Sequence, residues 1–316
     1  MKKAFLIFTL IMMLIVPVHA SSNVPALKVK NGKLVNAKGK VVQLKGISTH
    51  GINWFPRYVN QSTFNDLKKN KCDVVRLAMY TNEYNGYTSG GSKSKLLKLI
   101  DQGVSYAKKS HMYVIIDWHI LSDGNPLTHL KESKQFFSKV SKKYKRVPNV
   151  LYEICNEPNN TSWSNVKSYA KKVSPVIRKN TNAPIIIGTT TWSQDVDQAV
   201  NSPVKGKNLL YAFHFYAGTH HQDLRNKLIQ AMKKKLPVFV SEYGIVNADG
   251  NGKVNKKEAN AWARVMDRYK LSSCMWNLSN KNESSSVLKA NCQKLSGFKT
   301  SDLTVSGKWL KNYLTK

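Results

Sequence analysis

The chain has 316 residues, with 50 Lys and Arg against 18 Asp and Glu, which gives a formal net charge of +32 at pH 7. Such an excess of positive charge attracts polyanions in a salt-dependent manner. The sequence has no zinc-finger spacing, basic zipper or aromatic RNA-binding signature, so nucleic acid is a disfavoured partner. Acidic polysaccharides such as pectin, or anionic cell surfaces, are the favoured polyanions. The alternative is that the lysines only keep the surface solvated.

The first twenty residues have the pattern of a secretory signal peptide. Lys2 and Lys3 precede an apolar run at 4–16, and Val18-His19-Ala20 offers small residues at the −3 and −1 positions of a cleavage site. The apolar run is short for a membrane span, and no later stretch is long enough to form one. We therefore expect a secreted, extracellular protein, with a signal peptide at residues 1–20 and one domain at residues 21–316.

The cysteines lack the spacing of a metal site. Secretion permits disulfides, and Cys274 and Cys292 are the pair closest in sequence. The alternative is that cysteines in apolar strands act as small core residues. The four are Cys72, Cys155, Cys274 and Cys292. Five Asn-x-Ser/Thr sequons matter only in a host that glycosylates; they begin at Asn60, Asn159, Asn160, Asn277 and Asn282.

In chain order, a small hairpin is expected around residues 27–39, followed by eight apolar, β-branched runs. Near-continuous hydrophobicity is typical of strands buried on both faces of a parallel sheet. The runs are 41–49, 72–80, 113–120, 150–155, 184–191, 209–216, 237–241 and 272–278. Segments of helical periodicity lie between most of them, clearest at 94–109, 129–144, 163–179, 222–235 and 256–269. Repeated strand–helix units predict a (β/α)8 TIM barrel, with the hairpin closing its floor.

Two of these runs bring a glutamate to the end of a strand. Glu157 follows the fourth run in Asn156-Glu157-Pro158, and Glu242 follows the seventh in Ser241-Glu242-Tyr243-Gly244. A parallel barrel places its chemistry at that end of its strands. Two facing carboxylates can cleave a glycosidic bond, one as proton donor and the other as nucleophile or base.

Polar and aromatic residues mark the ends of the other strands. Aromatic faces stack on pyranose rings, and amides, imidazoles and hydroxyls bond sugar hydroxyls. Each residue alone has a structural alternative: a core histidine, a tryptophan packed at the rim, or an ion pair for Arg76, Asp117 or Glu153. Together they favour a sugar site, whose residues include His50, Trp54, Arg76, Tyr80, His119, Trp192, His214, Tyr216 and Trp276.

Six segments together resemble glycoside hydrolase family 5, and within it the bacterial-type endo-β-1,4-glucanases. They contain Leu44 to Gly51, Val75 to Tyr80, Ile116 to His119, Tyr152 to Pro158, Phe213 to Tyr216 and Val240 to Gly244. The resemblance runs from about Leu27 to the C-terminus. Cys155, where a small residue such as alanine is common, and the high net charge are the departures.

The resemblance implies a role for each site residue. Glu157 is the acid/base and Glu242 the nucleophile of a retaining mechanism, for which the expected carboxyl separation is about 5–5.5 Å. Arg76 and Tyr216 support Glu242, His214 lies beside Glu157, and Asn156 bonds the sugar 2-hydroxyl. The sugar-contacting residues are His50, Trp54, Tyr80, His119, Trp192, Trp276, Lys281 and Glu283.

The resemblance requires no metal and no organic cofactor, and we expect a monomer whose substrate is a β-1,4-glucan. Two alternatives stay open. One is a related β-mannanase or other β-glycanase with a different groove. The other is a non-catalytic wall- or polyanion-binding protein that keeps the barrel, which the presence of both glutamates disfavours.

Overall fold

The computed structural model describes residues 24–316 of the chain. The predicted signal peptide at residues 1–20 lies outside the described residues. Among residues 24–316, no helix has the length and apolar character that crossing a bilayer requires.

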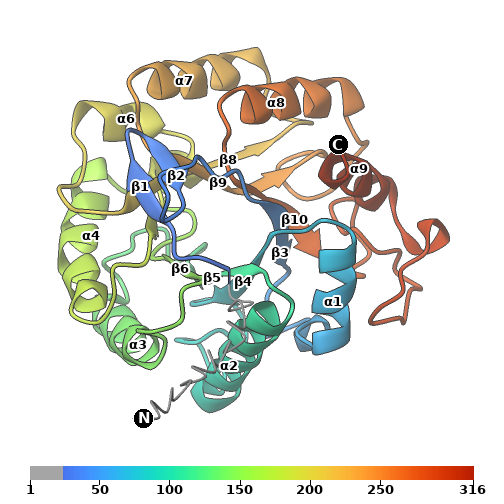
Figure 1. The fold of residues 1–316 in the computed structure, drawn as a ribbon, viewed down its shortest axis with the longest axis horizontal. Helices are drawn as coiled ribbons and strands as arrows, with labels where there is room; N and C mark the ends of the chain where they lie inside the picture. The colour runs from blue at the N-terminus through green and yellow to red at the C-terminus, as the bar shows by residue number, and fades with distance from the viewer. Residues whose placement is uncertain (1–23) are drawn as a thin grey trace, which may run out of the picture.

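Eight parallel strands close into a barrel, as predicted (Figure 1). Their order around the barrel is β10-β3-β4-β5-β6-β7-β8-β9, so each strand lies beside its neighbour in sequence and the last pairs with the first. The strands are β3 (Lys45–Thr49), β4 (Val74–Tyr80), β5 (Tyr113–His119), β6 (Val150–Glu153), β7 (Ile185–Ile187), β8 (Leu209–Tyr216), β9 (Val238–Gly244) and β10 (Ser273–Leu278). The fifth strand is shorter than predicted, and the seventh extends through Glu242 to Gly244.

Helices surround the barrel (Figure 1). The five predicted helices are present with ends shifted by no more than two residues: α2 (Lys93–Lys109), α3 (Leu130–Lys143), α4 (Trp163–Arg178), α7 (Gln222–Lys233) and α8 (Lys256–Arg268). The others are α1 (Gln61–Lys69), α5 (Thr190–Ser193), α6 (Val196–Asn201), α9 (Val305–Leu314), η1 (Pro56–Tyr58) and η2 (Thr300–Asp302). The hydrophobic periodicity of the sequence did not predict α1, because this helix is mostly polar. It is fixed instead by the cap at Asn60, whose side chain accepts from the Thr63 amide.

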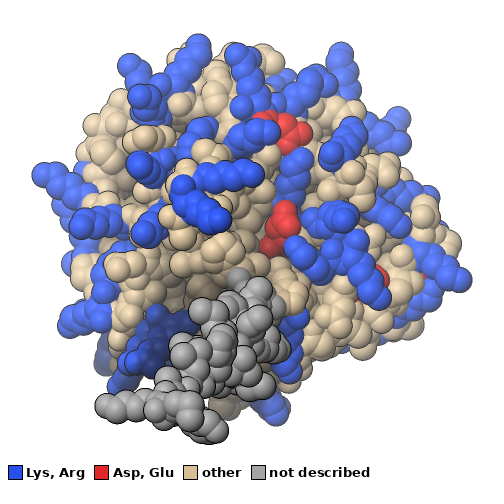
Figure 2. Space-filling view, in the orientation of Figure 1, with Lys and Arg blue, Asp and Glu red and all other residues tan. Residues whose placement is uncertain are grey.

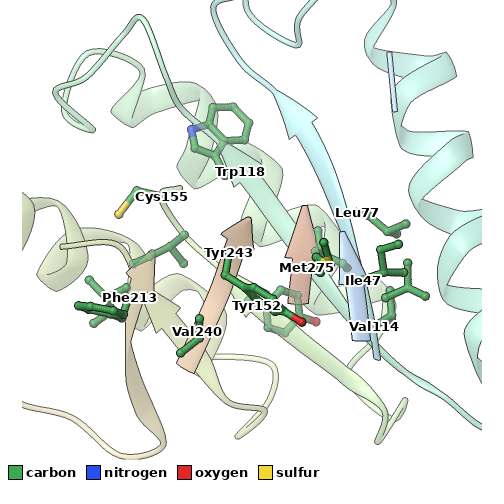
Figure 3. Close-up of a cluster of buried hydrophobic side chains, with 14 of the residues drawn as sticks. Ile47, Leu77, Val114, Trp118, Tyr152, Cys155, Phe213, Val240, Tyr243 and Met275 are labelled. Carbon is green, nitrogen blue, oxygen red and sulfur yellow. The ribbon is translucent and has the colours of Figure 1, made fainter. Parts of the chain in front are cut away.

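Alternate residues of each strand point outward and form the main core with the helices. In β4, for example, Val75, Leu77 and Met79 belong to this outer core and are fully buried. Figure 3 shows members of the outer core from most of the barrel strands, including Tyr152 of β6 and Phe213 of β8.

The inward-facing residues change character along the barrel axis. At the amino ends of the strands they are apolar, as with Val74, Ile115 and Leu151. Halfway along they are charged or polar, and Arg76, Asp117 and Glu153 are all fully buried. The barrel interior therefore has an apolar lower layer and a polar middle layer.

A two-stranded hairpin closes the floor of the barrel, as predicted. It consists of β1 (Lys28–Lys30) and β2 (Lys33–Val35), and it lies in front of the barrel strands in Figure 1. Leu27 and Leu34 pack in one cluster with the apolar lower layer. The floor is therefore sealed with hydrocarbon.

Of the two possibilities left open for the cysteines, the Cys274–Cys292 bridge is absent. All four cysteines lie among the described residues, and each is buried and free. Cys274 faces into the apolar lower layer, whereas Cys292 packs in the outer core, so the two side chains belong to different clusters. The alternative reading, small core residues, is the one that holds.

Replacing Leu34 by alanine should destabilise the protein without changing its chemistry. Leu34 is 5% exposed, and removing a buried leucine side chain costs about 2–5 kcal/mol. We expect a lower urea midpoint for L34A and an unchanged kcat/KM, because the hairpin lies at the opposite end of the barrel from the glutamates. K38A, in the exposed loop after the hairpin, is the control. A midpoint for L34A equal to that of K38A would contradict the packing role.

Candidate active site

One buried arginine joins four strands behind the two glutamates. Arg76 Nε lies 2.7 Å from Glu153 Oε2, and Nη1 lies 2.9 Å from Glu242 Oε2. Nη2 lies 3.0 Å from Asp117 Oδ2 and donates to Asn156 Oδ1 at 2.6 Å. The guanidinium thus binds three carboxyl groups and an amide in the middle layer of the barrel, where solvent does not reach.

Glu242 has two donors that favour its ionised form. Besides Arg76, the Tyr216 hydroxyl donates to Glu242 Oε1 at 2.7 Å. Burial alone would raise the pKa of Glu242, but the positive charge of Arg76, together with His214 and the Tyr216 hydrogen bond, lowers it. Glu242 is therefore held as a carboxylate.

Glu157 has the opposite environment. It follows β6 in the loop that packs near α5, and its Oε1 lies 2.8 Å from His214 Nδ1. Burial and the negative charge of Glu242 raise the pKa of Glu157, although His214 acts against them. An oxygen of Glu157 lies within 4.8 Å of an oxygen of Glu242. Two neighbouring carboxyl groups therefore have pKa values shifted in opposite directions.

The buried charges around the pair can balance. Burial alone would lower the pKa of His214, but its contacts with Glu153 and Glu157 and the charge of Glu242 raise it to about 9. The pKa of Glu153 falls to about 2, because Arg76 and His214 outweigh burial. Burial raises the pKa of Asp117 well above its usual range, despite Arg76. The directions of these shifts favour a neutral cluster, in which the cations Arg76 and His214 face the anions Glu153 and Glu242.

Aromatic rings line the site on the side formed by β10, β3, β4 and β5. Trp54 and Tyr80 have ring centroids 4.4 Å apart, and His119 stacks on Trp276 at 5.4 Å. His50 lies between them, 5.1 Å from Trp276. Burial, acting with nearby positive charges, lowers the pKa of His119 to about 3, so its ring is neutral. These residues form a continuous wall of rings beside the carboxyl pair.

Lys281 and Glu283 lie beside the ring wall, after β10. Glu283 accepts from Asn277 Nδ2 and Ser285 Oγ, each at 2.8 Å, and Lys281 Nζ lies 2.5 Å from its other oxygen. His50 Nε2 is 3.8 Å from Glu283 Oε1. The lysine side chain is about half exposed, so its ammonium is available to a ligand.

Trp192 lies on the other side of the pair. Its side chain is 44% exposed and lines a cavity of about 510 Å³ with Glu157, His214, Tyr216 and Glu242. Trp192 sits in a left-handed turn, with φ of 53°, 52° and 60° at Thr191, Trp192 and Ser193. Such a turn is costly for residues with side chains. The Ser193 hydroxyl donates to the Asn156 carbonyl at 2.7 Å, which ties the turn to the Glu157 loop.

Sequence reasoning missed several residues of this cavity: Leu121, Thr191, Gln194, Thr219, His220 and Ala248. They lie in the segments that follow β5, β7, β8 and β9. Position after a strand was the only signal that could have found them, because none belongs to a chemically distinctive pattern.

Asn156 is more constrained than its predicted sugar contact suggests. Its Oδ1 accepts from Arg76, and its Nδ2 donates to the Ile120 carbonyl at 3.0 Å and lies 3.2 Å from His119 Nε2. A sugar hydroxyl would therefore have to share the amide with His119. Arg76 lies in the middle layer of the barrel, and the other predicted site residues lie at its carboxyl end, as expected.

The site also offers a set of donor atoms for a cation. One atom each from Glu157, His214 and Glu242 lies within 4.8 Å of the others. A metal ligand needs a free lone pair on the imidazole, whereas hydrogen bonds to Glu157 and Ser241 engage both ring nitrogens of His214.

A parallel barrel with two facing glutamates and an aromatic wall at its carboxyl end has the architecture of a glycoside hydrolase. The sequence model of the family described as Cellulase (glycosyl hydrolase family 5) matches residues 35–282. The chain belongs to this family, as the resemblance predicted.

Curated relatives agree with this assignment. Endoglucanase A of Butyrivibrio fibrisolvens is 48% identical over 295 residues, which cover 92% of this chain and 68% of that protein. An endoglucanase of Clostridium saccharobutylicum is 44% identical over 291 residues, which cover 90% of this chain and 64% of that protein. The chain thus spans about two thirds of the length of these relatives.

Solved structures agree as well. The structure described as Cellulase Cel5C_n is 41% identical, with a TM-score of 0.86 and 92% of each chain covered. The catalytic domain of Thermobifida fusca endoglucanase Cel5A is 35% identical, with a TM-score of 0.88, covering 92% of this chain and 97% of that one.

Replacing Arg76 by methionine should destabilise the protein strongly. The variant leaves the facing carboxyl groups buried without their cation, and breaking a buried pair in this way costs about 3–5 kcal/mol. We expect a large fall in the urea midpoint of R76M. The control K143A breaks an exposed pair with Asp101, which is worth about 1 kcal/mol or less. Equal losses in the two variants would refute the central role of Arg76.

Proposed function

We propose that this protein is a secreted endo-β-1,4-glucanase that cleaves internal bonds of cellulose or related β-glucans with retention of configuration. In this proposal residues 1–20 are the signal peptide and residues 21–316 the catalytic domain. The observation that carries the activity is the pair Glu157 and Glu242, whose pKa values shift in opposite directions within one cleft. The named activities of the relatives support the same reading.

The mechanism assigns each glutamate one role. Glu242, ionised between Arg76 and Tyr216, attacks the anomeric carbon. Glu157, protonated, donates its proton to the leaving glycosidic oxygen. In the second step Glu157, now a carboxylate, removes a proton from water, which attacks the glycosyl-enzyme and releases Glu242.

The separation of the pair supports retention. Retaining enzymes hold their carboxyl groups about 5–5.5 Å apart, whereas inverting enzymes leave about 6.5–9.5 Å for a water molecule. Oxygens of Glu157 and Glu242 lie within 4.8 Å of each other, which is closer than the spacing of inverting enzymes and supports direct attack by Glu242.

The two sides of the cleft support cleavage within a polymer. The ring wall with Trp54 and Tyr80 lies on the side of β3 and β4, and Trp192 lies on the side of β7. A glucan chain can therefore contact aromatic faces on both sides of the scissile bond. A β-mannan chain is the alternative substrate, and a substrate panel separates the two.

Each glutamate should be essential on carboxymethylcellulose. We expect no measurable turnover for E242A and a loss of about 10²–10⁴-fold for E157A, because general acid catalysis is worth that much. On an aryl cellobioside, whose phenolate departs without a proton, azide should rescue E157A by replacing water in the second step. E132A, on the outer helix α3, is the control. Retained activity in E242A, or a faster rate on mannan or xylan than on β-glucan, would contradict the proposal.

Retention itself is measured by NMR. The first product should appear as the β-anomer and then mutarotate. Initial release of the α-anomer would refute double displacement, whatever the behaviour of the variants.

We further propose that the face opposite the active site binds an acidic polysaccharide. A groove of about 690 Å³ beside the hairpin is lined by four exposed lysines, Lys28, Lys207, Lys234 and Lys235, and its lining within residues 24–316 includes no Asp or Glu. We call it the lysine groove. Figure 2 shows Lys and Arg widely spread on this hairpin side of the molecule, with few Asp and Glu.

The character of this face favours a polyuronate over single-stranded nucleic acid. Nucleic-acid grooves stack bases on aromatic rings. The exposed aromatic residues of the described chain, Tyr84 and Trp192, lie at the carboxyl end of the barrel. The aromatic residue in the lining of the lysine groove, Tyr211, is only 2% exposed, so the groove offers charge without an exposed ring for stacking. A polyuronate held there leaves the catalytic cleft free.

Removing the four charges of the lysine groove should weaken binding to immobilised polygalacturonate by about tenfold or more at low salt, which is 1.4 kcal/mol. The quadruple alanine variant at Lys28, Lys207, Lys234 and Lys235 is compared with one at Lys131, Lys134, Lys139 and Lys142, exposed lysines of α3 that carry the same total charge. Both should hydrolyse soluble glucan normally. Equal losses in the two variants, or tighter binding to DNA than to polygalacturonate, would overturn the proposal.

A further inference from the structure

A second chain of buried polar groups lies behind Glu157, and the mechanism above does not use it. Ser241 Oγ donates to Glu153 Oε1 at 2.7 Å. The same oxygen lies 2.9 Å from His214 Nε2, and His214 Nδ1 lies 2.8 Å from Glu157 Oε1. Ser241, Glu153 and His214 are all 1% exposed or less. We call this set the Ser241 relay.

The direction of each hydrogen bond in the Ser241 relay follows from its anionic end. Glu153 is an ionised carboxylate bound by Arg76, so it only accepts hydrogen bonds. Ser241 must therefore donate its hydroxyl proton to Glu153. Its oxygen is left to accept, and His214 Nε2 must carry a proton to donate.

The other ring nitrogen of His214 faces Glu157. Glu157 has to keep one oxygen free to give its proton to the leaving group. The oxygen beside His214 then accepts from Nδ1–H. With both nitrogens donating, the ring is an imidazolium.

Charged and titratable groups surround His214 on every side. Glu242 lies on β9, Glu153 on β6 and Glu157 in the loop after β6. Arg76 on β4 and Asp117 on β5 complete the middle layer. On its own strand, Tyr216 donates to Glu242. The inward residue of β7, Ile186, belongs to the apolar layer.

The buried cluster stays neutral through both steps of the proposed reaction if His214 stays positively charged. Before attack, Arg76 and His214 balance Glu153 and Glu242. In the glycosyl-enzyme, Glu242 is an ester and neutral, while Glu157 has lost its proton. The anions are then Glu153 and Glu157, and the buried cluster is again neutral provided that His214 stays charged.

We propose that Ser241 is a positioning residue that keeps both ring nitrogens of His214 protonated, so that His214 balances whichever of Glu157 and Glu242 is ionised. This inference rests on the proposed roles of those two glutamates. Ser241 acts through His214, because its hydroxyl is hydrogen-bonded to His214 and Glu153 and to neither Glu157 nor Glu242. It links the acid/base to the buried carboxylate of Glu153.

The test is the pH dependence of kcat/KM in S241A. Losing the acceptor at Nε2 disfavours the imidazolium form of His214 and lowers its pKa, so that both carboxylates become harder to ionise. Glu242 then ionises at higher pH, so the rise of kcat/KM on the acid side of the pH profile (the acid limb) shifts to higher pH. Glu157 also loses its proton at higher pH, so the fall of kcat/KM on the basic side (the basic limb) shifts to higher pH as well. We expect both limbs to rise by about one pH unit.

Two matched variants separate this effect from a packing defect. S241T keeps the hydroxyl and should restore the wild-type limbs. S273A removes a buried hydroxyl from the neighbouring strand β10, where Ser273 Oγ has no hydrogen-bond partner among residues 24–316. It should leave both limbs in place. A lower kcat in S241A with unchanged limbs would overturn the inference.

A second measurement does not depend on activity. In protein labelled with [15N]histidine, the two ring nitrogens of His214, assigned with H214Q, should both be protonated at pH 7. In S241A the ring should lose one of these protons at a lower pH than in the wild type. An unchanged titration of the ring in S241A would refute the role of Ser241, whereas active E242A would refute the proposed function and leave the ring titration intact.

Discussion

The geometry of the site depends on one guanidinium buried in the middle of the barrel. Arg76 holds groups from β5, β6 and β9 and the loop after β6, and its fork of donors fixes Glu242 and Asn156 relative to each other. An arginine without solvent is stable only where carboxylates surround it. Three acidic residues therefore surround Arg76 at one level of the barrel, Asp117, Glu153 and Glu242, and the proposed mechanism uses Glu242.

Much of this arrangement could be predicted from sequence, because the signals are local. Each barrel strand is a short apolar run, and each catalytic glutamate stands where such a run ends. Helices with an apolar stripe, such as α8, were found within a residue or two. What the sequence cannot specify is the partner of each buried charge. Arg76, Glu153 and Ser241 come together only when the barrel closes, since their separation along the chain bears no relation to their distance.

The errors have physical causes as well. Helix α1 is polar and is fixed by its cap. β7 ends early because the chain turns into the left-handed segment that carries Trp192. Nearness in sequence left a Cys274–Cys292 bridge open, but a strand places Cys274 inside the barrel while Cys292 packs outside. In the barrel strands, residues that face the interior alternate with residues of the outer core. Because most residues of both kinds are apolar, the hydrophobicity of a strand's sequence did not distinguish the two environments.

Because the hairpin and the apolar lower layer close the floor of the barrel, solvent enters its interior from the carboxyl end of the strands. The described residues thus leave the carboxyl pair open to solvent at the mouth, where the proposed mechanism places the polysaccharide. In that mechanism a bound chain blocks the mouth, and the departing fragment reopens it to water. Water and the hydroxyl of another sugar would then compete, through the same opening, for the sugar attached to Glu242.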